Sequence, residues 1–518
     1  MVLGSPHRDV QSNQPRPFDA VLGFMPSSYQ KAIFEWLRSG EGSCVVSAVP
    51  GSGKTTTLVK GAGYIPSSMR SRFLAFNKHI AEELNTRLPK HIKASTIHSL
   101  GLASLCKVYR GMPEIHPRKY SQIARDYLVN QNIKTDLRFE QQRLAELVKF
   151  TQLTLTDPTC KDSLKKLCHH YGLPIQRVDW NFLQRAVVEV LNRGVESAPQ
   201  VISYEDMVWL PVQLDIPVAN YDFLCVDEAQ DLNKAQLELV LRAHNSGARG
   251  IYVGDKNQAI MGFSASDNRS IANIIERTDA IQLPLSICYR CPTSHIELAN
   301  QIYNVIAPRP HAPAGTVSEI KIEELPKLVR GGDLIICRCF YPLIPVYYDL
   351  LAAAIPARIK NKDLSSQLLS LLEQIVGNVP FEYSKKEFTD ILRKWYAQRK
   401  KEMENDKIST MVIVNLHDKI QTLNAIYSGK NCHDTQDLKT AIENLSVPSK
   451  NAVNLTTIHG SKGLEAERVF HLRPHLVPHH KAKQDWEKEQ EKNLEFVALT
   501  RAKQDLFLVI ETRKLEVD

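Results

Sequence analysis

The stretch AVPGSGKT, Ala48 to Thr55, has glycines, a lysine and a hydroxyl at the spacing that holds nucleotide phosphates. Gly51 and Gly53 let backbone N–H groups approach phosphate oxygens without an intervening Cβ. Lys54 supplies a positive charge for the β- and γ-phosphates, and the Thr55 hydroxyl can bind Mg²⁺. An apolar run precedes the motif and a helical pattern follows it. The stretch predicts a nucleoside triphosphate site but does not say what the nucleotide is used for.

Two adjacent carboxylates follow a second apolar run, in DFLCVDEAQD (222–231). In a parallel sheet the carboxyl ends of the strands share one edge, so these acids are expected beside the phosphate loop. Asp227 can hold Mg²⁺ through water, and Glu228 can polarise an attacking water. A solvated acidic strand end is the alternative, but it does not explain why the apolar run stops at two acids.

The stretch LSICYRCP (285–292) allows two interpretations. Cys288 and Cys291 have the spacing of half a zinc site, or else Tyr289 and Arg290 between them carry the chemistry. The lack of a second ligand pair at a suitable spacing disfavours a structural metal.

Other candidate sites are weaker. Cys160 and the CHH run at 168–170 could be metal ligands, but their separation and helical context favour ordinary helix residues. The CRC at 337–339 is too closely spaced for a usual zinc site. The basic run 399–401 is typical of a solvated helix face, with contact to a nucleic-acid backbone as the alternative.

Short apolar runs alternate with helical patterns along the chain. Continuous apolarity is typical of strands buried on both faces, as in parallel sheets covered by helices. The expected strands are 43–49, 72–76, 222–228, 250–255, 280–285, 333–338, 468–472 and 506–510. Two charged stretches with helical periodicity, near 106–200 and 361–450, interrupt the alternation.

These patterns predict an α/β fold with two cores built on parallel sheets, each interrupted by a mostly helical insertion. The composition of the first residues predicts a disordered tail. The expected boundaries are 1–20 for the tail, 21–105 and 201–280 for the first core, 106–200 for the first insertion, 281–360 and 451–518 for the second core, and 361–450 for the second insertion.

The composition, 43% hydrophobic and 24% charged, is that of an ordinary soluble protein. The net charge of +8 fits a polyanionic partner, although such a mild excess is also common on solvated surfaces. Ten cysteines without a dense framework favour a reducing compartment. No apolar stretch reaches the ~20 residues that span a membrane, and no secretory signal is evident. A cytoplasmic, nucleoid-associated location is expected, or a nuclear or organellar one in a eukaryote.

Read in order, a series of motifs resembles superfamily 1 DNA helicases of the UvrD/Rep/PcrA type. The resemblance covers about 22–510, and its order makes it specific. The motifs are SSYQKAIFEW (27–36), AVPGSGKT (48–55), FNKHIAEEL (76–84), STIHSLG (95–101), ISYEDMVWLP (202–211), DEAQD (227–231), GDKNQAIMGF (254–263), CYR (288–290), TTIHGSKGLE (456–465) and FVALTRAK (496–503). The resemblance implies two RecA-like P-loop NTPase cores.

The resemblance also implies roles in binding and hydrolysing ATP. Gln30 would hydrogen-bond the adenine and Tyr289 would stack on it, while Glu465 would approach the ribose or γ-phosphate. Arg290 and Gln258 would reach the γ-phosphate. The implied catalytic residues are Lys54, Asp227, Glu228, Gln258, Arg290 and Arg501, the last as an arginine finger. The implied ATP-binding residues are Gln30, Ala48, Pro50, Gly51, Ser52, Gly53, Lys54, Thr55, Thr56, Tyr289, Arg290, Glu465 and Arg501. The implied Mg²⁺ ligands are Thr55 and Asp227.

Single-stranded DNA would cross both cores in such an enzyme. Phe263 matches an aromatic residue that stacks on a base, although Met261 and Ser264 beside it depart from the more usual aromatic and arginine. The other implied contacts are Phe76, Asn77, Thr96, His98 and His459. For each, a packed aromatic or a helix-capping polar residue is the alternative.

The function implied by the resemblance is an ATP- and Mg²⁺-dependent 3′→5′ DNA helicase. It would translocate on single-stranded DNA, unwind tailed duplexes, and be monomeric in isolation. Three alternatives stay open: a helicase for RNA or RNA–DNA hybrids, a non-unwinding motor that remodels protein–DNA complexes in repair or defence, and a plain P-loop switch or kinase. Arg290 and Arg501 disfavour the last.

Overall fold

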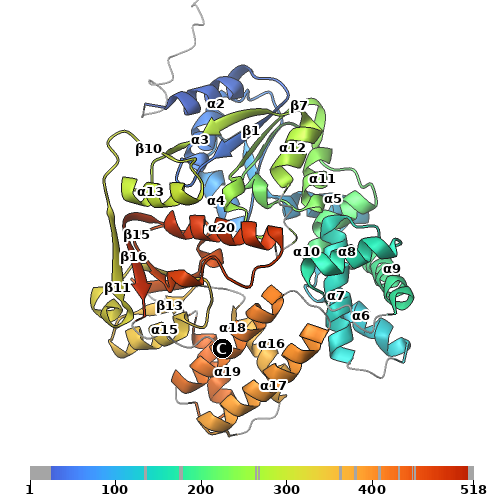
Figure 1. The fold of residues 1–518 in the computed structure, drawn as a ribbon. Coiled ribbons are helices and arrows are strands. Elements are labelled where there is room, and N and C mark those ends of the chain that lie inside the picture. The colour runs from blue at the N-terminus through green and yellow to red at the C-terminus, as the bar shows by residue number, and fades with distance from the viewer. Residues whose placement is uncertain are drawn as a thin grey trace, which may run out of the picture.

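The computed structural model describes residues 25–132, 137–173, 179–262, 265, 269–360, 364–377, 382–405, 410–429, 432–445, 447 and 451–511. The expected tail at 1–20 lies outside these residues. Two six-stranded parallel sheets form two cores, and a group of helices extends from each core (Figure 1). The predicted fold class is confirmed.

The first sheet has the strand order β3-β2-β6-β7-β1-β8. Its strands are β1 (Ser43–Ala48), β2 (Ser71–Ala75), β3 (Lys93–Thr96), β6 (Tyr221–Val226), β7 (His244–Gly254) and β8 (Ile281–Leu285). The helices of this core are α2 (Ser28–Ser39), α3 (Lys54–Gly61), α4 (Lys78–Arg87), α5 (Ile97–Tyr109), α10 (Tyr204–Gln213), α11 (Lys234–Arg242) and α12 (Ser270–Thr278). Because every pairing is parallel, the loops that follow β1, β2, β6 and β7 gather at one edge.

One expected boundary is wrong. The second core was expected to begin at 281, but β8 pairs with β1 in the first sheet, with Cys44 opposite Ile281. An apolar run predicts a strand but not its sheet. The buried strand β1 pairs with a strand on each side: β7 lies on one side and β8 on the other.

The second sheet has the order β11-β16-β15-β12-β14-β13 and is also parallel. Its strands are β11 (Thr316–Lys321), β12 (Leu334–Cys337), β13 (Ala357–Ile359), β14 (Val453–Thr457), β15 (Ala466–Leu472) and β16 (Ala502–Ile510). Its helices are α13 (Thr293–Ile302), α14 (Leu325–Leu328), α15 (Leu343–Ala352) and α20 (Asp485–Leu499). The connection between the cores contains β9 (Ile287–Cys288), which pairs with β10 (Ala307–Pro308).

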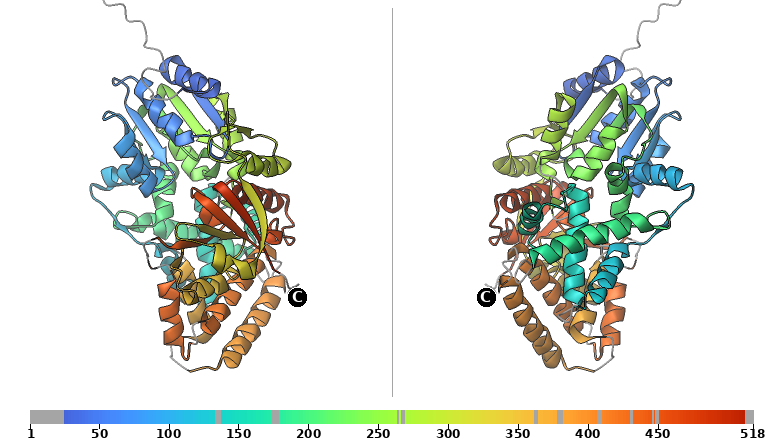
Figure 2. Two further views of the ribbon diagram at one scale, coloured as in Figure 1. Left: turned by 90° about the vertical axis from the view of Figure 1, so that its left-hand side faces the viewer. Right: turned by 90° about the vertical axis from the view of Figure 1, so that its right-hand side faces the viewer.

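Two helical groups interrupt the cores. The first comprises α6 (Lys119–Asn130), α7 (Leu137–Thr154), α8 (Lys161–Tyr171) and α9 (Trp180–Ser197), with β4 (Glu114–Ile115) paired to β5 (Val201–Ile202) at its base. The second comprises α16 (Leu364–Val376), α17 (Lys385–Asn405), α18 (Thr410–Gly429) and α19 (Thr435–Asn444). Both views of Figure 2 place the second group at the end of the molecule opposite α2. No described helix is long and apolar enough to cross a membrane.

A buried polar network joins the first insertion to its core. Asp206 of α10 is fully buried and accepts hydrogen bonds from Lys119 Nζ at 2.7 Å and Tyr120 Oη at 2.6 Å, both on α6. Gln152 Nε2 of α7 also donates to Asp206, at 3.1 Å. Asp206 caps its own helix through the Ser203 N–H. One carboxylate therefore links three helices.

Candidate active site at the cleft between the cores

The phosphate loop lies between β1 and α3. Gly51 and Gly53 have φ values of +67° and +76°, which only glycine adopts at low cost. No side chain caps the start of α3, so its first N–H groups can bind phosphate oxygens. The hydroxyl of Ser52 is buried and has no hydrogen-bond partner in the described structure. The loop therefore fits the phosphates of a nucleotide.

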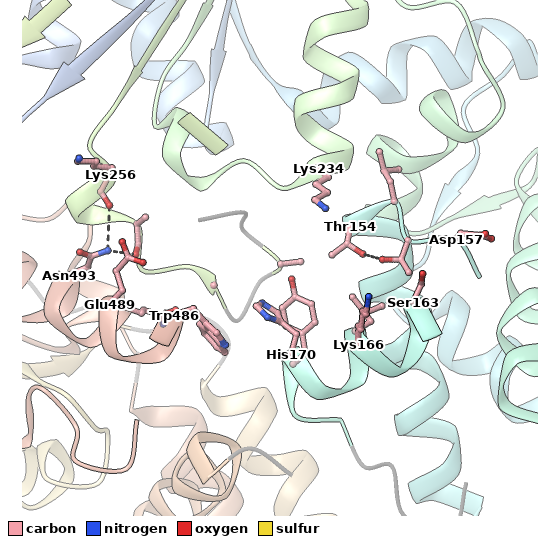
Figure 3. Close-up of a pocket in the computed structure, with 18 residues that line it drawn as sticks. Thr154, Asp157, Ser163, Lys166, His170, Lys234, Lys256, Trp486, Glu489 and Asn493 are labelled. Atoms are coloured by element: carbon pink, nitrogen blue, oxygen red, sulfur yellow. Dashed lines mark hydrogen bonds between the residues drawn. The ribbon is translucent and has the colours of Figure 1, made fainter. Parts of the chain in front are cut away.

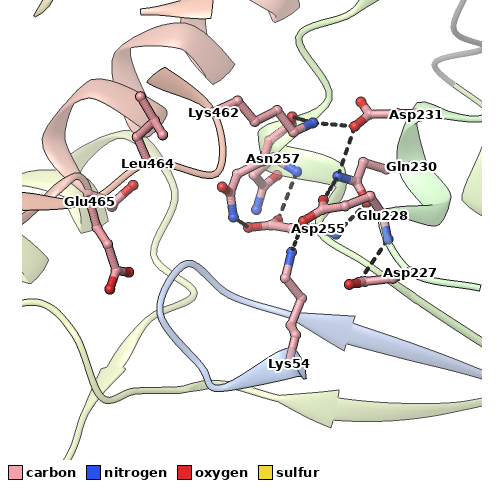
Figure 4. A network of polar contacts seen from close by, with 12 residues as sticks. Lys54, Asp227, Glu228, Gln230, Asp231, Asp255, Asn257, Lys462, Leu464 and Glu465 are labelled. Atoms are coloured by element: carbon pink, nitrogen blue, oxygen red, sulfur yellow. Dashed lines mark hydrogen bonds and ion pairs between the residues drawn. The ribbon is translucent and has the colours of Figure 1, made fainter. Parts of the chain in front are cut away.

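The ends of two strands bring charged groups to this loop (Figure 4). Lys54 Nζ lies 3.1 Å from Glu228 Oε1, just beyond β6. Asp227 accepts a hydrogen bond from the Glu228 N–H at 2.9 Å. Asp255, which follows β7, contributes to the negative potential around Lys54. Glu228 has a φ of +53°, a strained value for a non-glycine residue, as found at functional sites.

The adjacent carboxylates have opposite pKa shifts. Burial, reinforced by the Glu228 charge, raises the pKa of Asp227 to about 6. Burial also acts on Glu228, but Lys54 and Lys462 outweigh it and lower the pKa of Glu228 to about 2. Glu228 is therefore ionised at neutral pH. Asp227 is the acid whose ionisation a bound cation would favour most.

Of the two residues expected to contact adenine, Gln30 is buried and Tyr289 is exposed. Gln30 is 3% exposed: its Oε1 accepts the Ser27 N–H at 3.0 Å, and its Nε2 donates to Thr57 Oγ1 at 3.0 Å. Both ends of this amide are thus engaged within α2 and α3, so adenine recognition by Gln30 stays a prediction. The Tyr289 ring is 38% exposed, and its hydroxyl lies 3.5 Å from Gln30 Oε1. A ring so placed can stack on a base.

Two arginines that follow β8 in the chain reach the same cleft: Arg290, in the connection between the cores, and Arg501, in the second core. Arg290 Nε donates to Glu465 Oε2 at 2.6 Å. Arg501, which is 1% exposed, donates to Gln258 Oε1 of the first core at 3.1 Å. Burial, and then the Arg290 charge, lowers the pKa of Arg501 to about 9. An anion beside both arginines would offset this cost.

Lys462 is a cleft residue that was not predicted. Its Nζ pairs with Asp231 and donates to the Gln258 carbonyl at 2.8 Å, so a second-core lysine holds two first-core residues. Its charge also acts on Glu228. Lys462 and Asp231 lie in the motifs TTIHGSKGLE and DEAQD, but neither motif indicates that the two residues pair.

The structure thus gathers the predicted nucleotide residues. Lys54 pairs with Glu228, and contacts through Gln230 and Asp231 lead on to Lys462. Lys462 in turn contacts Gln258, which accepts a hydrogen bond from Arg501. Thr55 is half-buried in the first turn of α3, Thr56 is exposed, and Ala48 and Pro50 are buried beside the loop. Their individual roles remain predictions.

The predicted nucleic-acid residues are more dispersed. Phe76, 48% exposed, follows β2. Asn77 caps α4 through the Ile80 N–H, and Thr96 caps α5 through the Ser99 N–H, which is the alternative role considered for both. Burial lowers the pKa of His98, and burial with Arg338 and Lys462 lowers the pKa of His459 to about 3. Phe263 lies outside the described residues.

Cys288 and Cys291 are both buried directly behind the phosphate loop. Cys288 Sγ would lie 2.9 Å from a Cβ at Gly51 and accepts the Cys291 N–H at 3.3 Å. The hydrogen bond from Cys291 lowers the pKa of Cys288 to about 6. Among the described residues, no group of three His, Cys, Asp or Glu side chains is placed to hold a metal ion. The two thiols pack the turn that carries Tyr289 and Arg290.

The basic run 399–401 lies on α17. Arg399 pairs with Glu402, and its guanidinium lies 4.5 Å from the ring centroid of Phe139 on α7. Lys400 lies 3.8 Å from Glu404. In this structure Arg399 and Lys400 contact other side chains of the protein, and Arg399 connects the two insertions.

Comparison with known proteins gives a consistent result. Residues 29–279 match the UvrD/REP helicase N-terminal domain. The chain is similar to the ATP-dependent DNA helicase PcrA of Staphylococcus epidermidis (24% identical over 314 residues, covering 55% of this chain and 40% of that protein). It is similar to the PcrA of Staphylococcus aureus to nearly the same extent (23% over 311 residues, 55% and 40%). The matched region thus spans less than half the length of these relatives.

Proposed function

From the confirmed resemblance to superfamily 1 helicases of the UvrD/Rep/PcrA type, we propose that this chain is an ATP-dependent 3′→5′ DNA helicase that translocates on single-stranded DNA. One observation carries the proposal: Arg501 and Lys462 of the second core contact Gln258 of the first core, beside the Lys54–Glu228 pair of the phosphate loop. A P-loop switch or kinase requires no such second core. The region matched in the PcrA relatives supports DNA as the substrate.

Each residue has a role that its position permits. The glycine-rich loop and Lys54 bind the phosphates. Thr55 and Asp227 would hold Mg²⁺, which would neutralise charge on the phosphates. Glu228, which is ionised and close to Lys54, orients the attacking water. Arg290 and Arg501 stabilise the charge that develops during phosphoryl transfer.

Coupling between hydrolysis and movement depends on Gln258. This residue follows β7 in the first core, and its side chain accepts a hydrogen bond from Arg501 and donates to Asp255 at 2.6 Å. Loss of the γ-phosphate would change the charge that these groups face. The two cores can then separate and close again, which is the gating that a stepping motor requires.

Unwinding of tailed duplexes tests the proposal. We expect ATP-dependent product from 3′-tailed DNA and much less from 5′-tailed DNA. Lys54→Ala should lower ATP hydrolysis about 100-fold or more, because it removes a charge that binds the transferring phosphate, while single-strand binding is retained. Lys60→Ala, at the exposed end of the same helix, is the matched control.

The outcomes separate the alternatives. Single-strand-stimulated ATP hydrolysis without strand separation would indicate a remodelling motor, and product only from RNA-containing duplexes would indicate an RNA or hybrid helicase. ATP hydrolysis that no nucleic acid stimulates would contradict the proposal. Normal turnover by Lys54→Ala would show that the site is wrongly placed.

A further inference from the structure

Cys288 and Cys291 have no part in the proposed mechanism, but they flank the two residues of this turn that do. Both cysteines are buried, at 0% and 1% exposure, on either side of Tyr289 and Arg290. The chain bends after Cys288, and the Cys291 N–H donates to the Cys288 sulfur at 3.3 Å. The two thiol groups also hydrogen-bond to each other. Two cysteines whose side chains meet in this way can form a disulfide.

The two thiols differ in acidity. The hydrogen bond from Cys291 outweighs burial and lowers the pKa of Cys288 to about 6, with smaller effects of the Arg290 N–H and charge. The same hydrogen bond, together with burial, raises the pKa of Cys291. By contrast, burial raises the pKa values of Cys44 and Cys337 to about 12. Because the thiolate is the nucleophile, Cys288 is the more reactive sulfur of the pair, and Cys291 lies where it can attack the oxidised product.

The pair lies directly behind the phosphate loop. The Gly51 carbonyl accepts the Tyr289 N–H at 2.8 Å, so the turn and the loop share a backbone hydrogen bond. A Cβ at Gly51 would lie 2.9 Å from Cys288 Sγ and 2.5 Å from Arg290 Cβ, approaches that only a glycine permits. A movement of the Cys288 sulfur therefore acts on the loop that would bind the phosphates.

The pair also contacts the second core beside Arg501. Cys291 Sγ donates to the Thr500 carbonyl at 3.6 Å, and Arg290 Nη1 donates to the same oxygen at 3.2 Å. One carbonyl thus positions a thiol and an arginine of the nucleotide site. The first of these contacts depends on the oxidation state of Cys291, because a disulfide sulfur has no hydrogen to donate.

The turn itself is the route by which a small molecule can reach the two sulfurs. The apolar cluster that encloses both cysteines includes Val49 and Ile260 of the first core. Next to Ile260, Asn493 donates to the Ala259 carbonyl at 2.9 Å, and Figure 3 shows the adjoining cavity of about 670 Å³. No cysteine is among the described residues that line this cavity. The Tyr289 side chain, in contrast, is 38% exposed, so we expect local opening of this turn to admit a small oxidant.

We propose that Cys288 and Cys291 are a site of reversible oxidative modification, at which a hydroperoxide converts the two thiols to a disulfide and thereby inactivates the ATP site. The Cys288 thiolate attacks one peroxide oxygen, the O–O bond breaks, and the hydroxide that leaves takes up a proton to become water. The Cys291 thiol then attacks the sulfur of the resulting sulfenic acid, the S–O bond breaks, and a second water leaves. With hydrogen peroxide, two thiols are oxidised and one peroxide is reduced to two waters. The inference rests on the proposed function, because it assigns regulation to the same ATP site.

A disulfide would displace the arginine beside it. Its two sulfurs lie about 2.05 Å apart, closer than two hydrogen-bonded thiols, so the turn that carries Arg290 must shift. Misplacement of a group by about 1 Å can cost about 100-fold in rate, and we expect ATP turnover to fall about tenfold to 100-fold. In reducing surroundings, thiol–disulfide exchange would return the pair to the active form.

Peptide mapping tests whether the disulfide forms. The full chain is treated with hydrogen peroxide, the remaining thiols are alkylated, and the protein is digested with trypsin. Because trypsin cuts after Arg290, Cys288 and Cys291 fall in separate peptides that only a disulfide holds together. We expect mass spectrometry to detect the linked peptides after treatment, and only the separate peptides after reduction with dithiothreitol.

ATP hydrolysis stimulated by single-stranded DNA measures the effect on the site. Turnover by wild type should fall about tenfold or more after peroxide treatment and recover after dithiothreitol. The double variant Cys288→Ser/Cys291→Ser keeps a hydrogen-bonding group at each position and should be insensitive to peroxide. Cys160→Ser, which removes a partly exposed thiol of the first insertion, is the matched control and should be as sensitive as wild type. Each protein is compared with its own untreated rate, so an altered basal rate does not obscure the result.

The outcomes distinguish the inference from the proposed function. The inference is overturned if peroxide yields no linked peptides, if linked peptides form without loss of turnover, or if wild type and the double variant lose turnover equally. An untreated wild-type chain that hydrolyses no ATP with single-stranded DNA would instead overturn the proposed function, and peptide mapping would still show whether the disulfide forms.

Discussion

His471 on β15 is a buried histidine with no hydrogen-bond partner on either ring nitrogen in the described structure. It is 2% exposed, and burial, with a smaller effect of His475, lowers its pKa to about 4. The imidazole is therefore neutral in the folded protein at neutral pH. A buried neutral histidine makes the folded state sensitive to acid, independently of the catalytic groups.

Replacing this residue should flatten the dependence of stability on pH. As pH falls from 6.5 toward 4, the unfolded chain binds a proton that the folded protein rejects, so stability is lost as pH falls. Between pH 7 and pH 5 this loss is about 2 kcal/mol. Between pH 7 and pH 5, the free energy of unfolding of His471→Leu, measured with urea, should therefore fall by about 2 kcal/mol less than that of wild type. His79→Leu, at an exposed position, serves as the control, and equal pH dependence of wild type and His471→Leu would contradict the prediction.

At the scale of elements, the attachment of the first insertion depends on one carboxylate. Burial raises the pKa of Asp206, and burial lowers the pKa of Lys119, so each charged group depends on the other. Such a pair contributes little relative to an apolar pair, but removal of one partner leaves a buried charge. The orientation of α6 and α7 on α10 is therefore tied to the protonation state of this pair.

We expect Asp206→Asn to cost about 3–5 kcal/mol of stability, because it leaves the Lys119 ammonium buried without a counter-charge. Asp215→Asn is a matched control, since Asp215 pairs with Arg242 but is 93% exposed. That substitution should cost less than about 1 kcal/mol. Urea unfolding of both variants measures the difference, and similar costs would show that burial of the pair is not what matters.

Much of the sheet architecture could be predicted from the sequence. Each of the eight expected strands overlaps a strand of the structure, and most of them are apolar because they are buried; β8, an edge strand with an exposed face, is the exception in burial. Lys93–Thr96, Thr316–Lys321 and Ala357–Ile359 were missed because they form β3, β11 and β13 at sheet edges, and edge strands need less apolar surface. Val453–Thr457 was missed because β14 is polar in sequence and short.

The cleft was predictable as a set of motifs, but its contacts were not. Lys54, Glu228 and Arg501 could be placed because their motifs have fixed spacing. Lys462 could not, because its partner Asp231 lies 231 residues away in the chain and only the folded cores bring the two together. Pairings at such separation leave no local sequence signal.

At the scale of the whole molecule, Lys462 of the second core makes two contacts with the first core. Its side chain is 11% exposed and binds Asp231 and the Gln258 carbonyl, both on the first core. Burial raises the pKa of Asp231 to about 6, and Lys462 opposes that shift. The lysine thus holds the two cores in the arrangement in which Gln258 contacts Arg501.

We expect Lys462→Met to lower DNA-stimulated ATP turnover about tenfold or more, because it weakens closure and leaves Asp231 buried without its partner. Single-strand binding should fall much less. Lys327→Met, an exposed lysine of α14 in the same core, is the control and should have wild-type turnover. Steady-state kinetics on both variants decides the point, and wild-type turnover by Lys462→Met would contradict this role.

The place of β1 in the first sheet has a consequence for how the protein is made. This strand is translated early, yet its two neighbours are β7 and β8, which end at residues 254 and 285. During synthesis, the mostly apolar strand β1 therefore has neither of its sheet partners until the whole first insertion has emerged from the ribosome. The phosphate loop attached to it reaches its final geometry late, and nascent chains stalled within the insertion should be prominent chaperone clients.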